Sequence, residues 1–572
     1  MYIEIVPNRG SPPAILLREG WRAGAKVRKR TLANLSHWPP QKVDALRRVL
    51  QDQPLVCPQA VFVIEQSCPH GHVEAVLGTV RKLGLEQLIA SRRCRERDLV
   101  VAMLVQVLIH PASKLGATRL WHTTTLAEEL GVADADEDEL YEAMDWLLAR
   151  QGRIEKKLAA RHLEEGTQVL YDVSSSYYEG RTCPLALFGY NRDGKKGKTI
   201  IVYGVLTDRE GRPIAAEVYP GNTGDPSTVP DQVDKLRERF GLKHVVLVGD
   251  RGMLTETQID TLKKHPGLGW ISALTFNAIR ALADQEQIVP SLFDERNLAE
   301  MVSQEFPGER LIACFNPFLY EERRRKRGEL LAATEKELAR IGREAARRTR
   351  KPLKKEEIGV KVGKVINRYK MGKHFELAIE ENLLRYARRQ DSIQHEAQLD
   401  GIYVIRTSEP AERLSAPDTV RAYKQLTKVE QLFRTIKGIN RLVRPIRHRA
   451  ETRVRAHIFL TVLAYYVCWH MRRALAPLLF EDEELEKSRA TRDPVAPAKP
   501  SESATEKKIS RRTADGEPIH SFETLLAELG TRCRNRCRVK TDRSGPSFVQ
   551  LTEPNRLQAR ALQLLGLLLP VG

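Results

Sequence analysis

Apolar residues change their spacing along this chain, and the change divides it into regions of different structure. Over about 73–165 they recur every three to four residues, which predicts amphipathic helices in three runs, 73–83, 98–108 and 138–148. Residues 1 to about 55 show no such spacing, so we expect an irregular, basic arm there. We take 1–165 as one N-terminal region made of this arm and the helices.

From residue 168 the pattern becomes typical of strands. A β-rich run begins at Val169, and two further runs, 199–206 and 212–219, are separated by a polar loop with Gly211, which predicts a hairpin. Asp225 and Pro226 favour the start of a helix, with Asp225 as its cap. A buried strand, a helix and another strand follow at 244–250, 256–264 and 269–274. This order predicts an α/β fold with a mixed sheet flanked by helices.

The rest of the chain is assigned by the same signals. A strand-like run, a highly charged helix and a returning strand fill 276–405, which we interpret as an inserted subdomain. A helix over 421–437 would then close the sheet, and the apolar run 456–471 predicts a buried helix because it is shorter than the ~20 residues that span a membrane. The predicted division is 1–165, 166–275 (first part of the core), 276–405 (insertion), 406–480 (second part of the core), 481–520 (a linker without regular structure) and 521–572 (a small helical and turn element).

Charge points to the class of partner. The chain has a formal net charge of +19 and a pI of about 9.5. Nucleic acid is the first choice for an anionic partner, ahead of a membrane surface. The N-terminus lacks a secretory pattern, and eight scattered cysteines do not suggest a disulfide framework, so we expect a cytoplasmic protein outside the membrane.

The basic segment around residue 430 contains a carboxylate among cations. From Arg421 to Arg455 there are eleven Lys or Arg residues and two acids. At helical spacing one face carries Tyr423, Glu430, Arg434 and Lys437. This arrangement favours a metal-binding acid surrounded by groups that hold a polyanion.

Two aspartates complete the candidate site with Glu430. Asp172 lies within the first strand of the block, and Asp250 ends an apolar strand that we expect to neighbour it. Alone, each acid has an ordinary explanation: a turn acid, a helix cap, or an ion pair of Glu430 with Arg434. Together they suit two hard divalent ions, which favours in-line phosphoryl displacement by a nuclease or a transesterase.

These residues resemble the insertion-sequence transposases of the DDE type. One branch carries the signature Tyr, two residues, Arg, three residues, Glu, six residues, Lys. This chain has Tyr423, Glu430 and Lys437 at that spacing, with Leu426 where the family has Arg. The basic residues available in its place are Lys424, Lys428 and Arg434.

Other segments extend the resemblance over about 165–470. They are Tyr171-Asp172-Val-Ser-Ser, Gly221-Asn-Thr-Gly-Asp225, Val248-Gly-Asp250-Arg-Gly, and Arg444-Pro with His448. Less distinctly, the similarity includes Arg28-Lys-Arg-Thr-Leu-Ala-Asn-Leu-Ser near the N-terminus.

The resemblance implies an RNase H-like core that cleaves DNA at the ends of a mobile element and joins it to target DNA. It implies Asp172, Asp250 and Glu430 as ligands of Mg²⁺, for which Mn²⁺ substitutes. It also implies that Tyr423 and Lys437 contact the terminal DNA strand, with Arg434 as a further DNA contact. The partners implied are terminal inverted repeats, target DNA and a second copy of the chain, in the nucleoid of a bacterial cytoplasm.

Two alternative functions and two structural questions remain open from sequence. The protein could be an RNase H-like nuclease without strand transfer, or a non-catalytic DNA-binding protein derived from a transposase, although the presence of all three acids argues against the latter. The N-terminal helices could read DNA or serve only as packing. Trp270, in a predicted strand, could stack on a base or belong to the core.

Overall fold

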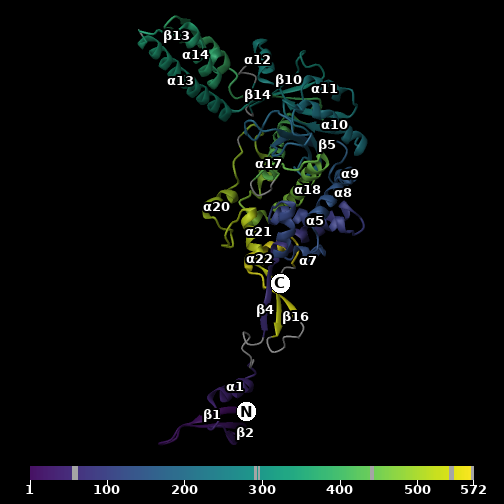
Figure 1. Ribbon diagram of the computed structural model, residues 1–572, viewed down its shortest axis with the longest axis vertical. Helices are drawn as coiled ribbons and strands as arrows, with labels where there is room; N and C mark the ends of the chain where they lie inside the picture. The colour runs from purple at the N-terminus through teal and green to yellow at the C-terminus, as the bar shows by residue number, and fades with distance from the viewer. Residues whose placement is uncertain are drawn as a thin grey trace. The chain divides into compact units, whose positions relative to one another are not determined.

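The computed structural model describes residues 1–53, 62–288, 293, 297–348, 350–438, 443–496, 498–539 and 547–568. The chain divides into two compact units, one of Met1–Pro69 with Arg532–Glu553 and the other of His70–Thr531 with Pro554–Gly572 (Figure 1). The predicted boundary at residue 165 therefore falls inside the second unit.

The first unit begins with an antiparallel sheet, where the sequence predicted an irregular arm. Its strands are β1 (Tyr2–Val6), β2 (Ala14–Ala23) and β3 (Lys26–Asn34), in that spatial order, and α1 (Pro40–Leu50) follows them. Every residue of β3 is exposed. The expectation was wrong because β3 lacks the apolar alternation that reveals a half-buried strand, and only its ladder to β2 defines it.

A second sheet of this unit joins segments from opposite ends of the chain. It consists of β4 (Phe62–Pro69), β15 (Cys533–Val539) and β16 (Ser547–Leu551), all antiparallel, with β15 in the middle. The C-terminal residues 521–572 were expected to form one small element. The structure divides them instead, because α21 (Phe522–Gly530) and α22 (Arg556–Leu564) belong to the second unit.

The second unit is built around an eight-stranded sheet of order β10-β11-β14-β9-β8-β5-β6-β7. Its strands are β5 (Thr167–Tyr177), β6 (Ile200–Asp208), β7 (Pro213–Pro220), β8 (Val245–Val248), β9 (Leu268–Ala273), β10 (Leu298–Met301), β11 (Arg310–Phe315) and β14 (Ile402–Thr407). β5, β6 and β7 are antiparallel, whereas β8 and β9 run parallel to β5. The five neighbouring strands β9-β8-β5-β6-β7 have the order of an RNase H-like sheet. The predicted fold is therefore confirmed.

The inserted region is only partly a separate subdomain. β14, β11 and β10 continue the core sheet antiparallel from β9. The rest of the insertion forms its own hydrophobic cluster, in which the charged helix buries Leu331, Leu338 and Ile341. The elements of the insertion outside the sheet are α12 (Phe276–Asp284), α13 (Pro317–Arg347), α14 (Lys355–Tyr369), β12 (Phe375–Glu380), β13 (Leu383–Arg388) and α15 (Gln390–Ala397).

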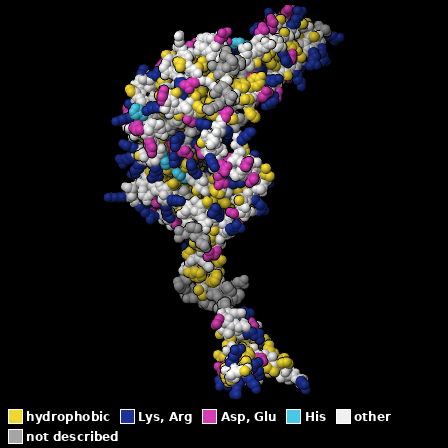
Figure 2. Space-filling view, turned by 180° about the vertical axis from the view of Figure 1, so that it is seen from behind, with side chains coloured by type: hydrophobic (Ala, Val, Ile, Leu, Met, Phe, Trp, Pro, Cys, Tyr) yellow, Lys and Arg dark blue, Asp and Glu magenta, His cyan; other side chains and the backbone are white. Residues whose placement is uncertain are grey.

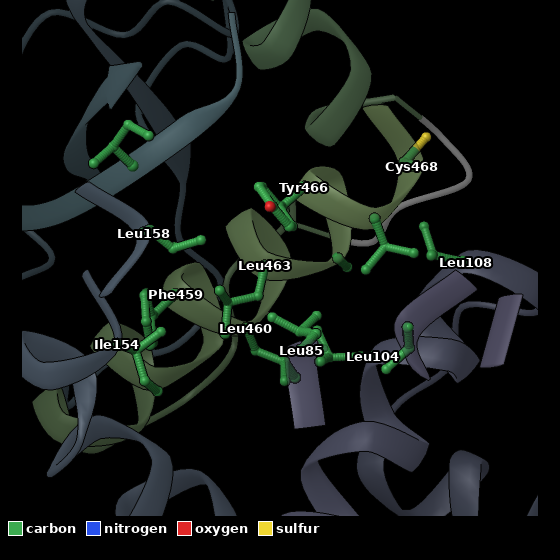
Figure 3. Close-up of a cluster of buried hydrophobic side chains, with 14 of the residues drawn as sticks. Leu85, Leu104, Leu108, Ile154, Leu158, Phe459, Leu460, Leu463, Tyr466 and Cys468 are labelled. Atoms are coloured by element: carbon green, nitrogen blue, oxygen red, sulfur yellow. The ribbon is translucent and has the colours of Figure 1, made fainter. Parts of the chain in front are cut away.

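One face of the sheet is covered by the predicted N-terminal helices. These are α3 (Gly71–Lys82), α4 (Leu85–Ile89), α5 (Arg95–Ile109), α6 (Lys114–Leu120), α7 (Leu126–Leu130), α8 (Glu137–Leu148) and α9 (Gln151–His162). They pack around α18 (Glu451–Leu475), the predicted buried helix (Figure 3). Trp270 is 3% exposed in the same cluster, so its assignment to the core is confirmed.

The opposite face is covered by α16 (Ala416–Lys424) and α17 (Leu426–Ile436). On α17, Leu432, Phe433 and Ile436 pack against the core, and the Phe433 ring lies 5.9 Å from that of Tyr203 on β6. The single helix expected over 421–437 is interrupted, since Gln425 is a turn residue between the two helices.

Two helices also occupy the segment expected to be a linker without regular structure. They are α19 (Leu485–Thr491) and α20 (Glu502–Ser510). The intervening Val495 is buried in the cluster beneath α17. Among the described residues no single helix is long and apolar enough to cross a membrane; α5 with residues Lys114–Thr123 passes only as a pair bent by 87°.

Candidate active site

Three structural elements bring the three predicted acids toward one edge of the sheet. Asp172 lies in β5, Asp250 follows β8, and Glu430 is on α17. β5 and β8 are parallel neighbours with Leu170 opposite Val248, so each aspartate stands two residues beyond that pair. Leu170 faces the cluster covered by α17, and Asp172 shares that face because strand residues alternate. The predicted adjacency of the two aspartate strands is confirmed.

Asp172 is a half-buried carboxyl group with a perturbed pKa. Its pKa is raised to about 7, mainly by burial and to a smaller extent by the charges of Asp250 and Glu430, against the lowering effects of the Val173 N–H and Arg192. Among the residues that the structure describes, its carboxylate accepts one hydrogen bond, from the Val173 N–H at 2.7 Å. The charges of both other acids thus act on Asp172.

Asp250 and Glu430 are both exposed. The Asp250 carboxylate accepts a hydrogen bond from the Met253 N–H at 2.8 Å, and its carbonyl accepts one from the Ser272 hydroxyl at 3.1 Å, which fixes the turn after β8. Across the described part of the chain, none of the three acids takes part in an ion pair.

The donor set suits a hard divalent cation, although the carboxylates do not converge on one point. Their oxygens are the ligands that Mg²⁺ and Mn²⁺ prefer, and a cation would relieve the mutual repulsion that raises the pKa of Asp172. Within the ranges that the structure describes, no group of three His, Cys, Asp or Glu side chains is arranged to hold a metal ion. An ion bound by all three carboxylates would require their side chains to move closer together.

Tyr423 lies beside this group despite the break in the helix. It packs against the sheet core from α16. Its pKa is raised to about 12, mainly by burial and also by the charges of Asp250 and Glu430. A tyrosine close to two acids remains protonated, so its hydroxyl can donate a hydrogen bond to an anionic ligand.

Lys437 is held by a buried aspartate that sequence reasoning missed. Its ammonium donates to the Ser175 carbonyl at 2.5 Å and to Asp193 at 3.3 Å, and burial lowers its pKa. Asp193 also accepts from the Arg444 guanidinium at 2.6 Å and from the Tyr177 N–H at 3.0 Å. This carboxylate links the end of β5 to the end of α17. The sequence did contain a signal for Asp193: it is an acid within the basic run 190–198, just as Glu430 is an acid within a basic segment.

Asp225 does not cap a helix as predicted. The short helical turn that it begins has Gly224 at the N-cap and no side-chain cap. Its carboxylate instead accepts from the Arg192 guanidinium at 2.6 Å. Arg192 in turn lowers the pKa of Asp172, so the turn at 221–225 positions a cation near the acids.

Three cations were considered as replacements for the arginine that the family has at the position of Leu426, and they differ in what they contact. Lys424 donates to the Pro494 carbonyl at 2.5 Å. Lys428 donates to the Arg209 carbonyl at 3.0 Å and pairs with Glu486 at 3.2 Å. Arg434 is exposed and makes no ion pair among the described residues. Arg434 is therefore the cation available to a phosphate.

The Asp172→Asn variant should be more stable than the parent at pH 8 in buffer with a chelator, by about 2 kcal/mol. Asn retains the acceptor for the Val173 N–H but carries no charge. The folded-state pKa of Asp172, about 7, lies above its ordinary value of 3.8, so the folded parent loses stability as pH rises from about 4 to 7. Chemical denaturation at pH 8 and pH 5 measures this.

The stability difference between the two proteins should shrink at pH 5, where more of the folded parent is protonated. The Asp134→Asn variant is the control, because its carboxyl is exposed and its pKa is lowered by Arg95. A loss of stability in Asp172→Asn at both pH values would contradict the electrostatic picture of the site.

Comparisons with known proteins identify the family. The model of the transposase DDE domain matches residues 174–467, just over half of the chain, and begins two residues after Asp172. The model of the IS1634 family transposase N-terminal domain matches residues 3–57. The chain therefore belongs to the DDE transposases and is a DNA transposase, from a family of enzymes that use divalent metal ions.

Two further comparisons complete this result. No curated protein matches the chain. Among solved structures, the chain is similar to the piggyBac transposase in a synaptic complex with hairpin DNA, at 10% sequence identity and a TM-score of 0.34, over 80% of this chain and 76% of that one.

Proposed function

We propose that this transposase uses Asp172, Asp250 and Glu430 to bind divalent ions, Mg²⁺ with Mn²⁺ as a substitute, and to cleave DNA at the terminal inverted repeats of its element. The released 3′ hydroxyl then joins to target DNA. The observation that supports the proposal is the placement of the three acids: β5 and β8 are neighbouring strands, and the charges of Asp250 and Glu430 both raise the pKa of Asp172.

The residues of the chain have distinct parts in this reaction. When bound, the ions activate the attacking hydroxyl and stabilise the leaving oxygen. The three carboxylates would hold these ions, and the ions would neutralise the charge of the reacting phosphate. Tyr423 donates from its protonated hydroxyl to the terminal strand, and Arg434 neutralises a phosphate. Lys437 contacts the same strand by exchanging the Ser175 carbonyl for a phosphate oxygen.

Joining two element ends requires two sites, so we propose that the active complex contains two copies of the chain. Each copy would hold one end, and the target would be the chromosomal DNA of a bacterial nucleoid. The net charge of +19 favours association with such a polyanion.

Incubating the full chain with a labelled duplex that carries the inverted repeats flanking the gene tests this function. In Mg²⁺ or Mn²⁺ we expect a nick at the repeat end and a product joined to target plasmid, and no product in EDTA. Denaturing gels resolve both products. Cleavage without joining would indicate a nuclease, and binding without cleavage would contradict the proposed catalysis.

A further inference from the structure

Half of the β2–β3 hairpin projects beyond the sheet to which it belongs. β1 pairs with β2 only over Ala14–Arg18. Beyond that point Glu19–Ala23 pairs with Lys26–Arg30 alone, across a tight turn at Gly24 (Figure 1). The outer half of the hairpin is therefore a two-stranded ribbon with both of its faces exposed.

The cations of the ribbon lie on both of its faces. On one face, Arg18 and Lys29 both pair with Glu4, at 2.8 and 3.2 Å, whereas Arg22 forms no ion pair among the described residues. The other face, which we call the ribbon face, carries Lys26, Arg28, Arg30, Trp21 and Glu19, because directly opposed residues share a face.

Most of the charge on the ribbon face is not neutralised within the protein. Arg30 pairs with Glu19 at 3.2 Å, whereas Lys26 and Arg28 make no ion pair among the residues described. Trp21, directly opposite Arg28, is 45% exposed. Figure 2 shows Lys and Arg side chains gathered on this unit. Cations without an ion-pair partner beside an exposed aromatic ring are the groups that an anionic ligand with stacking surfaces would contact.

The helices first considered as a DNA reader are occupied elsewhere. α5 is buried along most of its length and lies with α9 beside α18 (Figure 3). α3 and α8 contribute their apolar faces to the same core. Their role in the structure is packing. The basic ribbon is therefore the better candidate for docking DNA from the N-terminal part of the chain.

We propose that the ribbon face binds duplex DNA, with Lys26 and Arg28 neutralising phosphates and Trp21 packing against the sugar between them. A two-stranded β-ribbon fits the major groove of B-DNA. Phosphate contacts position a protein on the duplex independently of sequence. The inference rests on the proposed function, since it names how the transposase holds its substrate outside the active site.

The Lys26→Gln/Arg28→Gln variant tests the proposal, with Arg47→Gln/Arg48→Gln as the matched control. The control removes the same charge from α1 in the same unit, where both arginines pair with Asp44. Fluorescence anisotropy with a labelled mixed-sequence duplex measures affinity over a range of salt concentrations. We expect the ribbon variant to bind about tenfold more weakly, with a slope of log K against log salt shallower by about 2. The control should bind like the parent.

Three results would overturn the proposal: an unchanged ribbon variant, an equal loss in the control, or tighter binding of the parent to an RNA duplex. The variant Lys26→Arg/Arg28→Lys retains both charges and should regain affinity, which separates lost contacts from misfolding. Failure of the proposed catalysis is distinguishable, because it would abolish cleavage by the parent and leave the ribbon-dependent binding intact.

Discussion

The Glu430→Gln variant is expected to bind duplex DNA as tightly as the parent and to cleave it at least about 10³-fold more slowly, a loss of about 4 kcal/mol of transition-state stabilisation. Glu430 is exposed on α17, in no ion pair within the described ranges, so its replacement leaves the packing of that helix unchanged. Gln removes the charge with which Glu430 acts on Asp172. Single-turnover cleavage in Mg²⁺, at protein concentrations that saturate the DNA, measures this effect.

Glu412→Gln is the matched control, since Glu412 is an exposed glutamate that forms no ion pair in the described part of the chain. It should cleave like the parent. Parent-like cleavage by Glu430→Gln would remove this residue from the metal site. Equal loss in both variants would show that the effect comes from the change in net charge.

The second large effect is expected from Gly221→Ala, which should lower the free energy of unfolding by about 3 kcal/mol. Gly221 is buried, and its N–H donates to the Leu185 carbonyl at 2.9 Å. An added Cβ would overlap the carbonyl oxygens of Ile200 and Leu187. These two residues are bound to each other through their main chains, so neither oxygen can move away without losing that pairing. Chemical denaturation followed by circular dichroism measures the loss.

Gly224→Ala provides the comparison within the same turn. A Cβ at Gly224 would meet only the Pro226 ring, at 4.0 Å, and its φ of −76° suits any residue. This variant should unfold like the parent. Similar destabilisation by both changes would mean that the turn responds to lost glycine flexibility and not to the overlap at Gly221.

The sequence predicted the parts of the fold that have strong local signals. The hairpin of β6 and β7 follows from two apolar runs around a polar loop with Gly211, and this prediction is confirmed. The runs at 310–316 and 400–407 were recognised as strand-like, but not that they extend the core sheet. Strand pairing over long sequence separations depends on tertiary contacts, which local patterns do not contain.

The candidate site, too, could be predicted only where it depends on local sequence patterns. The adjacency of Asp172 and Asp250 followed from the order of the strands and is confirmed, whereas their roles as metal ligands remain a proposal. The break at Gln425 was missed because this residue suits a helix, and the apolar spacing continues through it. Asp193 was missed because its partners, Lys437 and Arg444, lie far away in sequence.

The pairing of β4 with β15 has a consequence for biosynthesis. β4 leaves the ribosome early, but its partner strand is made only near the end of translation. Until then the backbone groups of β4 on that side have no strand to bind, and an exposed strand edge favours association with other chains. The nascent polypeptide should therefore depend on chaperones for this sheet until synthesis is nearly finished.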